Sequence, residues 1–341
     1  MTPEISRRTA LKYLGLALTG TLSGTWAWDN RSGRLRLWQA AEAADVLGAM
    51  PALTISPQSN FHAVYDSPGS KEQFFLFLQH IYHLYPEREF HHLIYELTQL
   101  YRTDEEIYGR LQTELPSIAA PLSSVRYGLP ALHKQKTEMA RESAELLGRT
   151  APFKGYVEIG TTGRYVKALR DELPIKGPIF VLNDEAPGYA PSDIVERGQL
   201  FRIGTYLPMG NYEPFEDRIP PKSVDLVAVF IGFHHAPPDK RDRFIESIWH
   251  ALRPGGSLLV RDHDVATTEM NAFVGLAHDV FNAGLDIPWF ENAAQIRNFT
   301  SVRGLEALLM DQGFRPASRR QLQQYDPTKN TLMLFTKPLQ G

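Results

Sequence analysis

Between residues 71 and 149, apolar side chains recur at the three- and four-residue spacing of a helix. One run consists of Phe74, Phe75, Leu78, Ile81, Tyr82 and Tyr85, and the next of Phe90, Leu93, Ile94, Leu97 and Leu100. Prolines interrupt the pattern at positions 86, 116, 121 and 130. We therefore expect two or more packed helices in an extension over residues 71–150, preceded by an irregular linker over residues 28–70.

From residue 155 onward the pattern changes, and short apolar runs alternate with helical ones. The runs at 156–159, 179–182, 223–231 and 257–260 have the length and apolar character of buried strands, and helical patterns lie between them. Such alternation is typical of a parallel sheet with helices on both faces. The sequence therefore predicts a doubly wound α/β domain over residues 151–341.

Polar residues follow the first two predicted strands. Glu158, Gly160, Thr161 and Gly163 lie at the end of the first strand and in the turn behind it, where glycine permits a sharp bend and the close approach of a ligand to a helix N-terminus. The pair 183–184, Asn then Asp, ends the second strand about 20 residues further on, where a carboxylate can accept hydrogen bonds from ribose hydroxyls.

Histidines and acids follow the next two strands. The third strand runs into the sequence Gly232-Phe233-His234-His235, and the strand after Leu252-Arg253-Pro254-Gly255-Gly256 ends at Arg261-Asp262-His263-Asp264. Open α/β sheets bind ligands at these carboxyl ends, so His235 and His263 are candidates for a base or for orienting a substrate. The alternative is structural: His234 and His235 cap the loop and Asp262 serves the fold.

This succession of strand, acidic turn, His-His loop and Leu-Arg-Pro-Gly-Gly turn resembles class I S-adenosylmethionine-dependent methyltransferases over about residues 155–338. The resemblance implies a mostly parallel, seven-stranded Rossmann-like sheet and S-adenosylmethionine as the cofactor. It places Glu158, Gly160, Thr161 and Gly163 at the methionine part of the cofactor, Asp184 or Asn183 at the ribose, and the stretch from Phe230 through Gly232 to Phe233 as a wall of the site. The chain departs from the family at the second and third glycine positions, which hold Thr162 and Arg164.

The resemblance implies methyl transfer to a small-molecule or protein acceptor, with the helical extension and the segment 271–299 as a lid. Methyl transfer depends mainly on the alignment of donor and acceptor, and this interpretation includes no metal. Two alternatives stay open. One is a non-catalytic binding protein on the same scaffold, and the other is a metal-dependent hydrolase that uses His234, His235, Asp262, His263 and Asp264 as ligands.

The N-terminal sequence Ser6-Arg7-Arg8-Thr9-Ala10-Leu11-Lys12 resembles a twin-arginine export signal. A moderately apolar stretch over residues 13–24 follows, too short to span a bilayer. Residues 1–27 are therefore interpreted as a signal read by the twin-arginine translocase, which would place the protein in the periplasm or on the outer side of the inner membrane, with membrane contact only through this segment. The alternative is an amphipathic helix in a cytoplasmic protein. Export raises a supply question, because the methyl donor is made in the cytoplasm and a domain exported folded would carry one bound equivalent.

Composition narrows the remaining possibilities. Lys and Arg number 36 against 39 Asp and Glu, a formal net charge of -3, which gives no basis for nucleic-acid binding. The chain has no cysteine, so disulfides, thiolate zinc sites and a cysteine nucleophile are excluded. His80 and His83, like His91 and His92, have spacings that could hold a metal, but no acidic partner stands at a recognised spacing. We interpret these four as ordinary histidines beside an aromatic stripe.

Overall fold

The computed structural model describes residues 26–29, 34–37, 59–82, 85–118, 129–148 and 151–339. Strands β1 (Trp26–Asp29) and β2 (Arg34–Leu37) pair antiparallel in a small sheet of their own. The expected export signal over residues 1–27 lies outside the described residues, apart from the two that begin β1. Of the helices that the structure describes, none combines the length and apolar character needed to cross a membrane.

The main sheet has seven strands in the order β5-β4-β3-β6-β7-β9-β8. The strands are β3 (Phe153–Ile159), β4 (Ile175–Asn183), β5 (Thr205–Pro208), β6 (Val224–Val229), β7 (Leu252–His263), β8 (Arg315–Leu322) and β9 (Asn330–Thr336). The first five pair in parallel, and β9 runs antiparallel to both of its neighbours. This confirms the expected mostly parallel, doubly wound Rossmann-like sheet of seven strands. The strand order reverses at β3 and β6, the switch point at which such sheets bind ligands.

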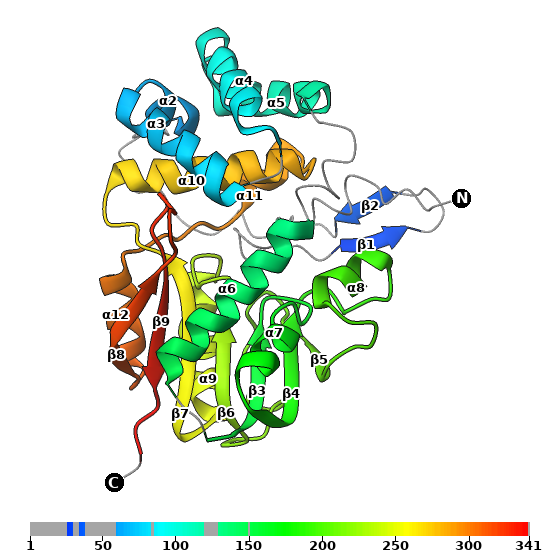
Figure 1. The fold of residues 1–341 in the computed structure, drawn as a ribbon, viewed down its shortest axis with the longest axis vertical. Coiled ribbons are helices and arrows are strands. Elements are labelled where there is room, and N and C mark those ends of the chain that lie inside the picture. Colours follow the sequence, from blue (N-terminus) through cyan, green and yellow to red (C-terminus); the bar gives the residue numbers. More distant parts are fainter. Residues whose placement is uncertain are drawn as a thin grey trace, which may run out of the picture.

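Helices cover both faces of this sheet (Figure 1). Helices α6 (Leu129–Leu147) and α7 (Val166–Glu172) pack on one face, and α9 (Pro238–Ala251) and α12 (Val302–Asp311) pack on the other. Along β3, Tyr156 faces the first helix pair, whereas Val157 and Ile159 face the second, as the alternation of side chains along a strand requires. Helix α6 therefore packs with the α/β domain, although its range falls within the extension expected over residues 71–150.

A second core lies in a helical layer over the edge at which the parallel strands end (Figure 1). It combines α2 (Asn60–Tyr65), α3 (Pro68–Phe77), a π-helical turn (Leu78–Tyr82), α4 (Glu87–Leu100) and α5 (Asp104–Ile118) with α10 (Thr268–Gly284) and α11 (Trp289–Ala294) from the far end of the sequence. The extension and the insertion after β7 thus form one layer, hereafter the helical layer.

Helix α2 and the start of α3, like the end of β1 and all of β2, fall inside the range 28–70 that we expected to be irregular, so that expectation does not hold for these elements. Tertiary contacts stabilise this short helix. The Ser59 hydroxyl accepts a hydrogen bond from the His62 backbone N–H at 3.1 Å, and Asp104 of α5 accepts one from the Asn60 backbone N–H at 2.8 Å. Six residues are too few for a clear helical period, which is why the sequence pattern did not reveal the helix.

Packing of the helical layer can be tested at Phe281. Its side chain is fully buried and its ring meets Tyr82 edge to face at 5.9 Å between centroids. We expect Phe281→Ala to lower the free energy of unfolding by about 3–5 kcal/mol, measured by urea denaturation. Phe290→Ala serves as the control, because that side chain is 64% exposed and its loss should change stability by no more than about 0.5 kcal/mol. Equal effects of the two substitutions would contradict the assigned packing.

Candidate functional site

The turn after β3 closes around the carboxylate of Glu158, which is fully buried. It accepts hydrogen bonds from the Tyr156 hydroxyl at 3.0 Å, from the Tyr165 backbone N–H at 3.1 Å and from the Thr161 hydroxyl. Burial raises the pKa of Glu158, and these three donors offset part of that rise. The Thr161 oxygen in turn accepts from the backbone N–H groups of Gly163 and Arg164, both at 3.1 Å. Glu158 therefore shapes the turn from inside.

The glycines of this turn serve the backbone. Gly160 has φ +85°, and a Cβ there would collide with the side chain of Ile231. Gly163 also has a positive φ, of +92°, but a Cβ there would make only ordinary contacts. Thr162, at the second glycine position, is buried, and its hydroxyl has no hydrogen-bond partner among the described residues. It brings a polar group to a place where the family has only a hydrogen atom.

Arg164, at the third glycine position, points toward α8 (Pro191–Arg197). Its guanidinium donates to Glu196 Oε1 from Nε at 3.1 Å and from a terminal nitrogen at 3.0 Å, and both side chains are at least 98% buried. The arginine that replaces the third glycine is thus accommodated, because its side chain leaves the turn and forms an ion pair with α8.

Asn183 and Asp184 end β4 beside this turn. The Asn183 side-chain N–H donates to the Glu185 carbonyl at 3.0 Å, and Asp184 Oδ1 accepts from the Asn211 backbone N–H at 3.0 Å. The amide oxygen of Asn183 and the second carboxylate oxygen of Asp184, Oδ2, are buried and make no hydrogen bond within the described part of the chain. Burial raises the pKa of Asp184, although nearby backbone N–H groups lower it in part. Buried polar atoms are normally hydrogen-bonded. These two unpartnered oxygens are therefore acceptors to which a ligand with hydroxyl groups could donate.

The stretch that the resemblance places along the site wall is buried. Phe230 packs edge to face on Tyr165, with ring centroids 4.8 Å apart, in the core under α6 and α7. Gly232 has φ +72°, and a Cβ there would collide with the Asp262 carboxylate. Both residues therefore have structural roles, and a contact of either with the cofactor stays a prediction.

Four imidazoles meet at the ends of β6 and β7, and we call His234, His235, His263 and His278 the imidazole cluster. Neighbouring ring centroids lie 4.3–5.8 Å apart, and each side chain is at most 4% exposed. The Phe299 ring packs against the cluster, 5.0 Å from the His278 centroid. The structure thus brings both candidate catalytic histidines, His235 and His263, into one enclosed group.

Hydrogen bonds fix the orientation of the rings. Nδ1 lies 2.6 Å from Asp262 Oδ1 in His234, 2.8 Å from the Ile296 carbonyl in His235 and 2.9 Å from the Val274 carbonyl in His278. A carbonyl oxygen can only accept, so the protons of His235 and His278 reside on Nδ1, and the Asp262 carboxylate imposes the same tautomer on His234. The Nε2 atoms of these three residues are buried and have no partner among the described residues.

The electrostatics of the cluster follow from burial. Burial lowers the pKa of His235, His263 and His278, and the neighbouring His234 lowers each further. Burial alone would raise the pKa of Asp262, but His234, His263 and the Phe233 backbone N–H hold it below its ordinary value. An ionised Asp262 carboxylate therefore lies in a cluster in which His235, His263 and His278 favour the neutral form.

Asp262 and Asp264, which the metal-dependent hydrolase alternative takes as ligands, have hydrogen-bond partners within the protein. Asp264 Oδ1 accepts a hydrogen bond from the Val302 backbone N–H at 2.9 Å, at the start of α12. Asp262 supports His234. The remaining histidines weighed as a metal pair have separate partners, since His80 contacts the Tyr325 ring and His91 contacts the Tyr65 hydroxyl at 3.1 Å.

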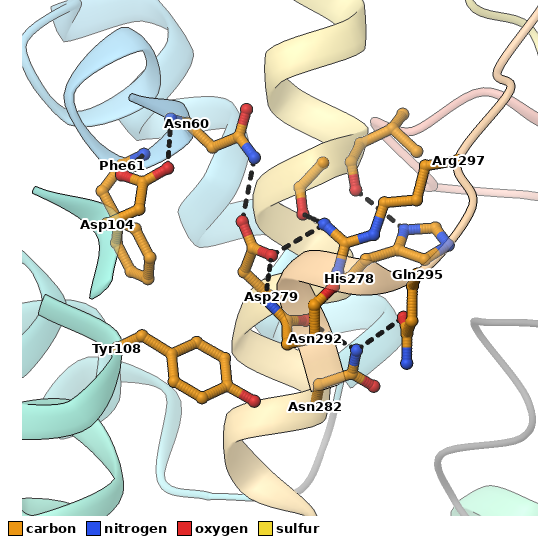
Figure 2. Close-up of polar contacts among 12 residues, drawn as sticks. Asn60, Phe61, Asp104, Tyr108, His278, Asp279, Asn282, Asn292, Gln295 and Arg297 are labelled. Carbon is orange, nitrogen blue, oxygen red and sulfur yellow. Dashed lines mark hydrogen bonds and ion pairs between the residues drawn. The ribbon is translucent and has the colours of Figure 1, made fainter. Parts of the chain in front are cut away.

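A buried carboxylate next to His278 ties the helical layer together (Figure 2). Asp279 accepts hydrogen bonds from Asn60 of α2 at 2.9 Å and from Asn292 of α11 at 2.8 Å, and it pairs with Arg297 at 2.7 Å. Arg297 lies next to the Ile296 carbonyl that orients His235. Sequence reasoning missed His278 and this network, because α10 carries buried residues on every side and so has no distinct polar face that would mark them.

Comparisons with known proteins find similarity among solved structures and not among families or curated sequences. No protein-family model matches the chain, and neither does any curated sequence. Among solved structures, a possible exported protein from Bordetella parapertussis shares 17% identity over 82% of this chain and 96% of its own, with a TM-score of 0.40. The 1,6-didemethyltoxoflavin-N1-methyltransferase of Burkholderia thailandensis, solved with S-adenosylhomocysteine, shares 15% over 70% and 92%, with a TM-score of 0.38.

The N-methyltransferase NodS of Bradyrhizobium japonicum, also solved with S-adenosylhomocysteine, shares 13% identity over 61% of this chain and 88% of its own, with a TM-score of 0.37. At these identities and TM-scores the assignment of the fold rests on the strand order of the sheet, and the function rests on the geometry of the site.

The ion pair that replaces the third glycine yields a prediction. Arg164→Met should lower the free energy of unfolding by about 3–5 kcal/mol, because it leaves the Glu196 carboxylate buried without its partner. The double variant Arg164→Met, Glu196→Met should be more stable than the single one, since an apolar pair of similar volume often replaces a buried ion pair at little cost. Urea unfolding of the single and double variants measures both, and additive losses would contradict the pairing.

Proposed function

We propose that this protein is an S-adenosylmethionine-dependent methyltransferase that acts on a small-molecule or protein acceptor. One observation carries the proposal. The unpartnered, buried oxygens of Asn183 and Asp184 end β4 next to the Glu158 turn, at the switch point of a sheet with this strand order. Ribose hydroxyls are donors that such oxygens can accept.

The residues present fit the donor. The side chain of Arg164 is directed to Glu196, so the change at the third glycine position does not place a guanidinium over the turn. The free hydroxyl of Thr162 adds a hydrogen-bonding group at the same turn. When bound, the sulfonium cofactor would supply an electrophilic methyl group. Asp184 and Asn183 would hold its ribose, and Glu158 would keep the turn in shape.

The acceptor side is the imidazole cluster and the helical layer above it. Methyl transfer needs alignment and the exclusion of water more than it needs a strong acid or base. His235 lies in the loop after β6 and His263 is the last residue of β7, at the edge where an acceptor next to the donor would lie. The helical layer, with α10 directly over the cluster, supports a role as the cover that keeps water out.

The ribose assignment can be tested with Asp184→Asn. The amide oxygen can still accept from the Asn211 backbone N–H, but the variant loses the charge that strengthens a hydrogen bond to a ribose hydroxyl. We expect the affinity for S-adenosylhomocysteine, measured by calorimetric titration, to fall by about 1.5–3 kcal/mol, which is roughly 10- to 150-fold.

Stability should not fall with it. Burial raises the pKa of Asp184, so its ionised form opposes folding at neutral pH, and the neutral amide removes that cost. Glu185→Gln is the control, because Glu185 is the exposed neighbour of Asp184 and the substitution removes the same charge next to the site. This variant should bind S-adenosylhomocysteine as the wild type does. Unchanged affinity in Asp184→Asn would overturn the ribose assignment. Folded wild-type protein that binds neither S-adenosylmethionine nor its demethylated product would favour a non-catalytic binding protein.

From the paired arginines we also propose export by the twin-arginine translocase. Arg7→Lys with Arg8→Lys keeps the charge of the segment but removes the paired arginines. In cell fractionation of the full chain, the wild type should reach the periplasmic or membrane fraction and the variant should stay in the cytoplasm. An identical distribution of the two would show that residues 1–27 are not this signal.

A further inference from the structure

We propose that His234, His235 and His278 bind one divalent transition-metal ion of the zinc type through their Nε2 atoms. The proposal does not depend on the methyltransferase function. It concerns three of the four residues of the imidazole cluster, two from the loop after β6 and one from α10 of the helical layer.

Proximity is the first argument. One ring nitrogen of each residue lies within 4.8 Å of those of the other two, and the three side chains are 1–3% exposed. Zinc–nitrogen bonds of about 2.0–2.1 Å place nitrogens around a tetrahedral ion about 3.4 Å apart. Nitrogens at the 4.8 Å limit would have to approach one another by about 1.4 Å, through rotation of the rings, to surround an ion.

Orientation is the second argument. In each of the three residues Nδ1 is engaged by an oxygen, namely the Asp262 carboxylate, the Ile296 carbonyl and the Val274 carbonyl. Metal-binding histidines characteristically donate their other N–H in this way, which fixes the tautomer and aims the lone pair of the second nitrogen. The three Nε2 lone pairs are buried without a donor among the described residues, a state that a metal ion would relieve.

The donor set and the charges around it indicate the kind of ion. Imidazole nitrogen suits zinc, cobalt, nickel and copper, whereas magnesium and calcium prefer oxygen ligands. The Asp262 carboxylate contributes a negative charge beside His234. The Arg297 guanidinium, which pairs with Asp279 at 2.7 Å, acts in the opposite sense, because its positive charge disfavours a second cation at His278 and His235. Three imidazoles leave a fourth position of a tetrahedral ion open for water or for an oxygen or nitrogen atom of an acceptor.

Cobalt(II) is the probe for this site, because a tetrahedral cobalt ion absorbs visible light and occupies zinc sites. The purified full chain is stripped with a chelator and titrated with cobalt(II) chloride. We expect one equivalent to bind with visible absorption that zinc then removes, and the thermal midpoint to rise because the ion binds only the folded protein. Wild-type protein that binds no cobalt and gains no stability overturns the proposal.

Variants locate the bound ion. His278→Gln removes one of the three ligands, so we expect it to weaken cobalt binding on the order of 100-fold. A loss of about tenfold is the least that this assignment requires. His235→Gln should do the same, and it decides the question if His278→Gln fails to fold by circular dichroism. His250→Gln is the matched control, because His250 belongs to an exposed group with Glu216 and Glu246 that could also hold an ion. Loss of binding in His250→Gln with retention in His278→Gln would place the ion at the surface and refute the buried site.

The same variants separate this proposal from the proposed function. Asp184→Asn should bind cobalt normally while losing affinity for S-adenosylhomocysteine. Cobalt binding without any donor binding would remove the methyltransferase proposal alone, and donor binding without cobalt binding would remove the metal site alone.

Discussion

The site depends on one buried carboxylate, that of Asp262 at the end of β7. It accepts hydrogen bonds from the Phe233 backbone N–H at 2.9 Å, from His234 Nδ1 at 2.6 Å and from the His263 backbone N–H at 2.9 Å. Because these donors come from the loop after β6 and from β7 itself, the carboxylate joins the ends of two adjacent strands. Its close approach requires a glycine at position 232, so the backbone of the loop and the orientation of His234 are set together.

A second buried carboxylate, that of Asp279, joins separate segments of the helical layer, as Asp262 joins the ends of two strands. It gathers donors from α2, from α11 and from Arg297, and so it holds three separate segments against α10. The neighbouring residue His278 is thereby carried to the sheet edge, and Ile296 is held where its carbonyl orients His235. Removal of a partner from such a network strands a buried charge, which costs more than the loss of an ordinary hydrogen bond.

The sequence predicted the parts of the structure that repeat a local pattern. Alternation of strands and helices predicted the doubly wound sheet, and position at strand ends predicted that Glu158, Asp184, His235 and His263 would gather at one edge. It did not predict α2, which is too short for a period, nor His278, which lies in a helix buried on every side. The direction of Arg164 also depends on a partner in α8 that no local rule connects to it. These features arise from contacts between distant segments, where periodicity carries no information.

Because the imidazole cluster is buried, access of a ligand to it depends on movement of the segments that hold its four rings together. The four rings are at most 4% exposed, so a ligand can reach them only if a segment that covers them moves, such as α10 or the segment that carries Phe299. One covering element is α10, which carries His278, so a displacement of α10 would separate His278 from His234 and His235. Because the Asp279 network holds α10 in place, opening requires the disruption of its charged hydrogen bonds. A movement of α10 would thus change access to the sheet edge and the three-imidazole arrangement together.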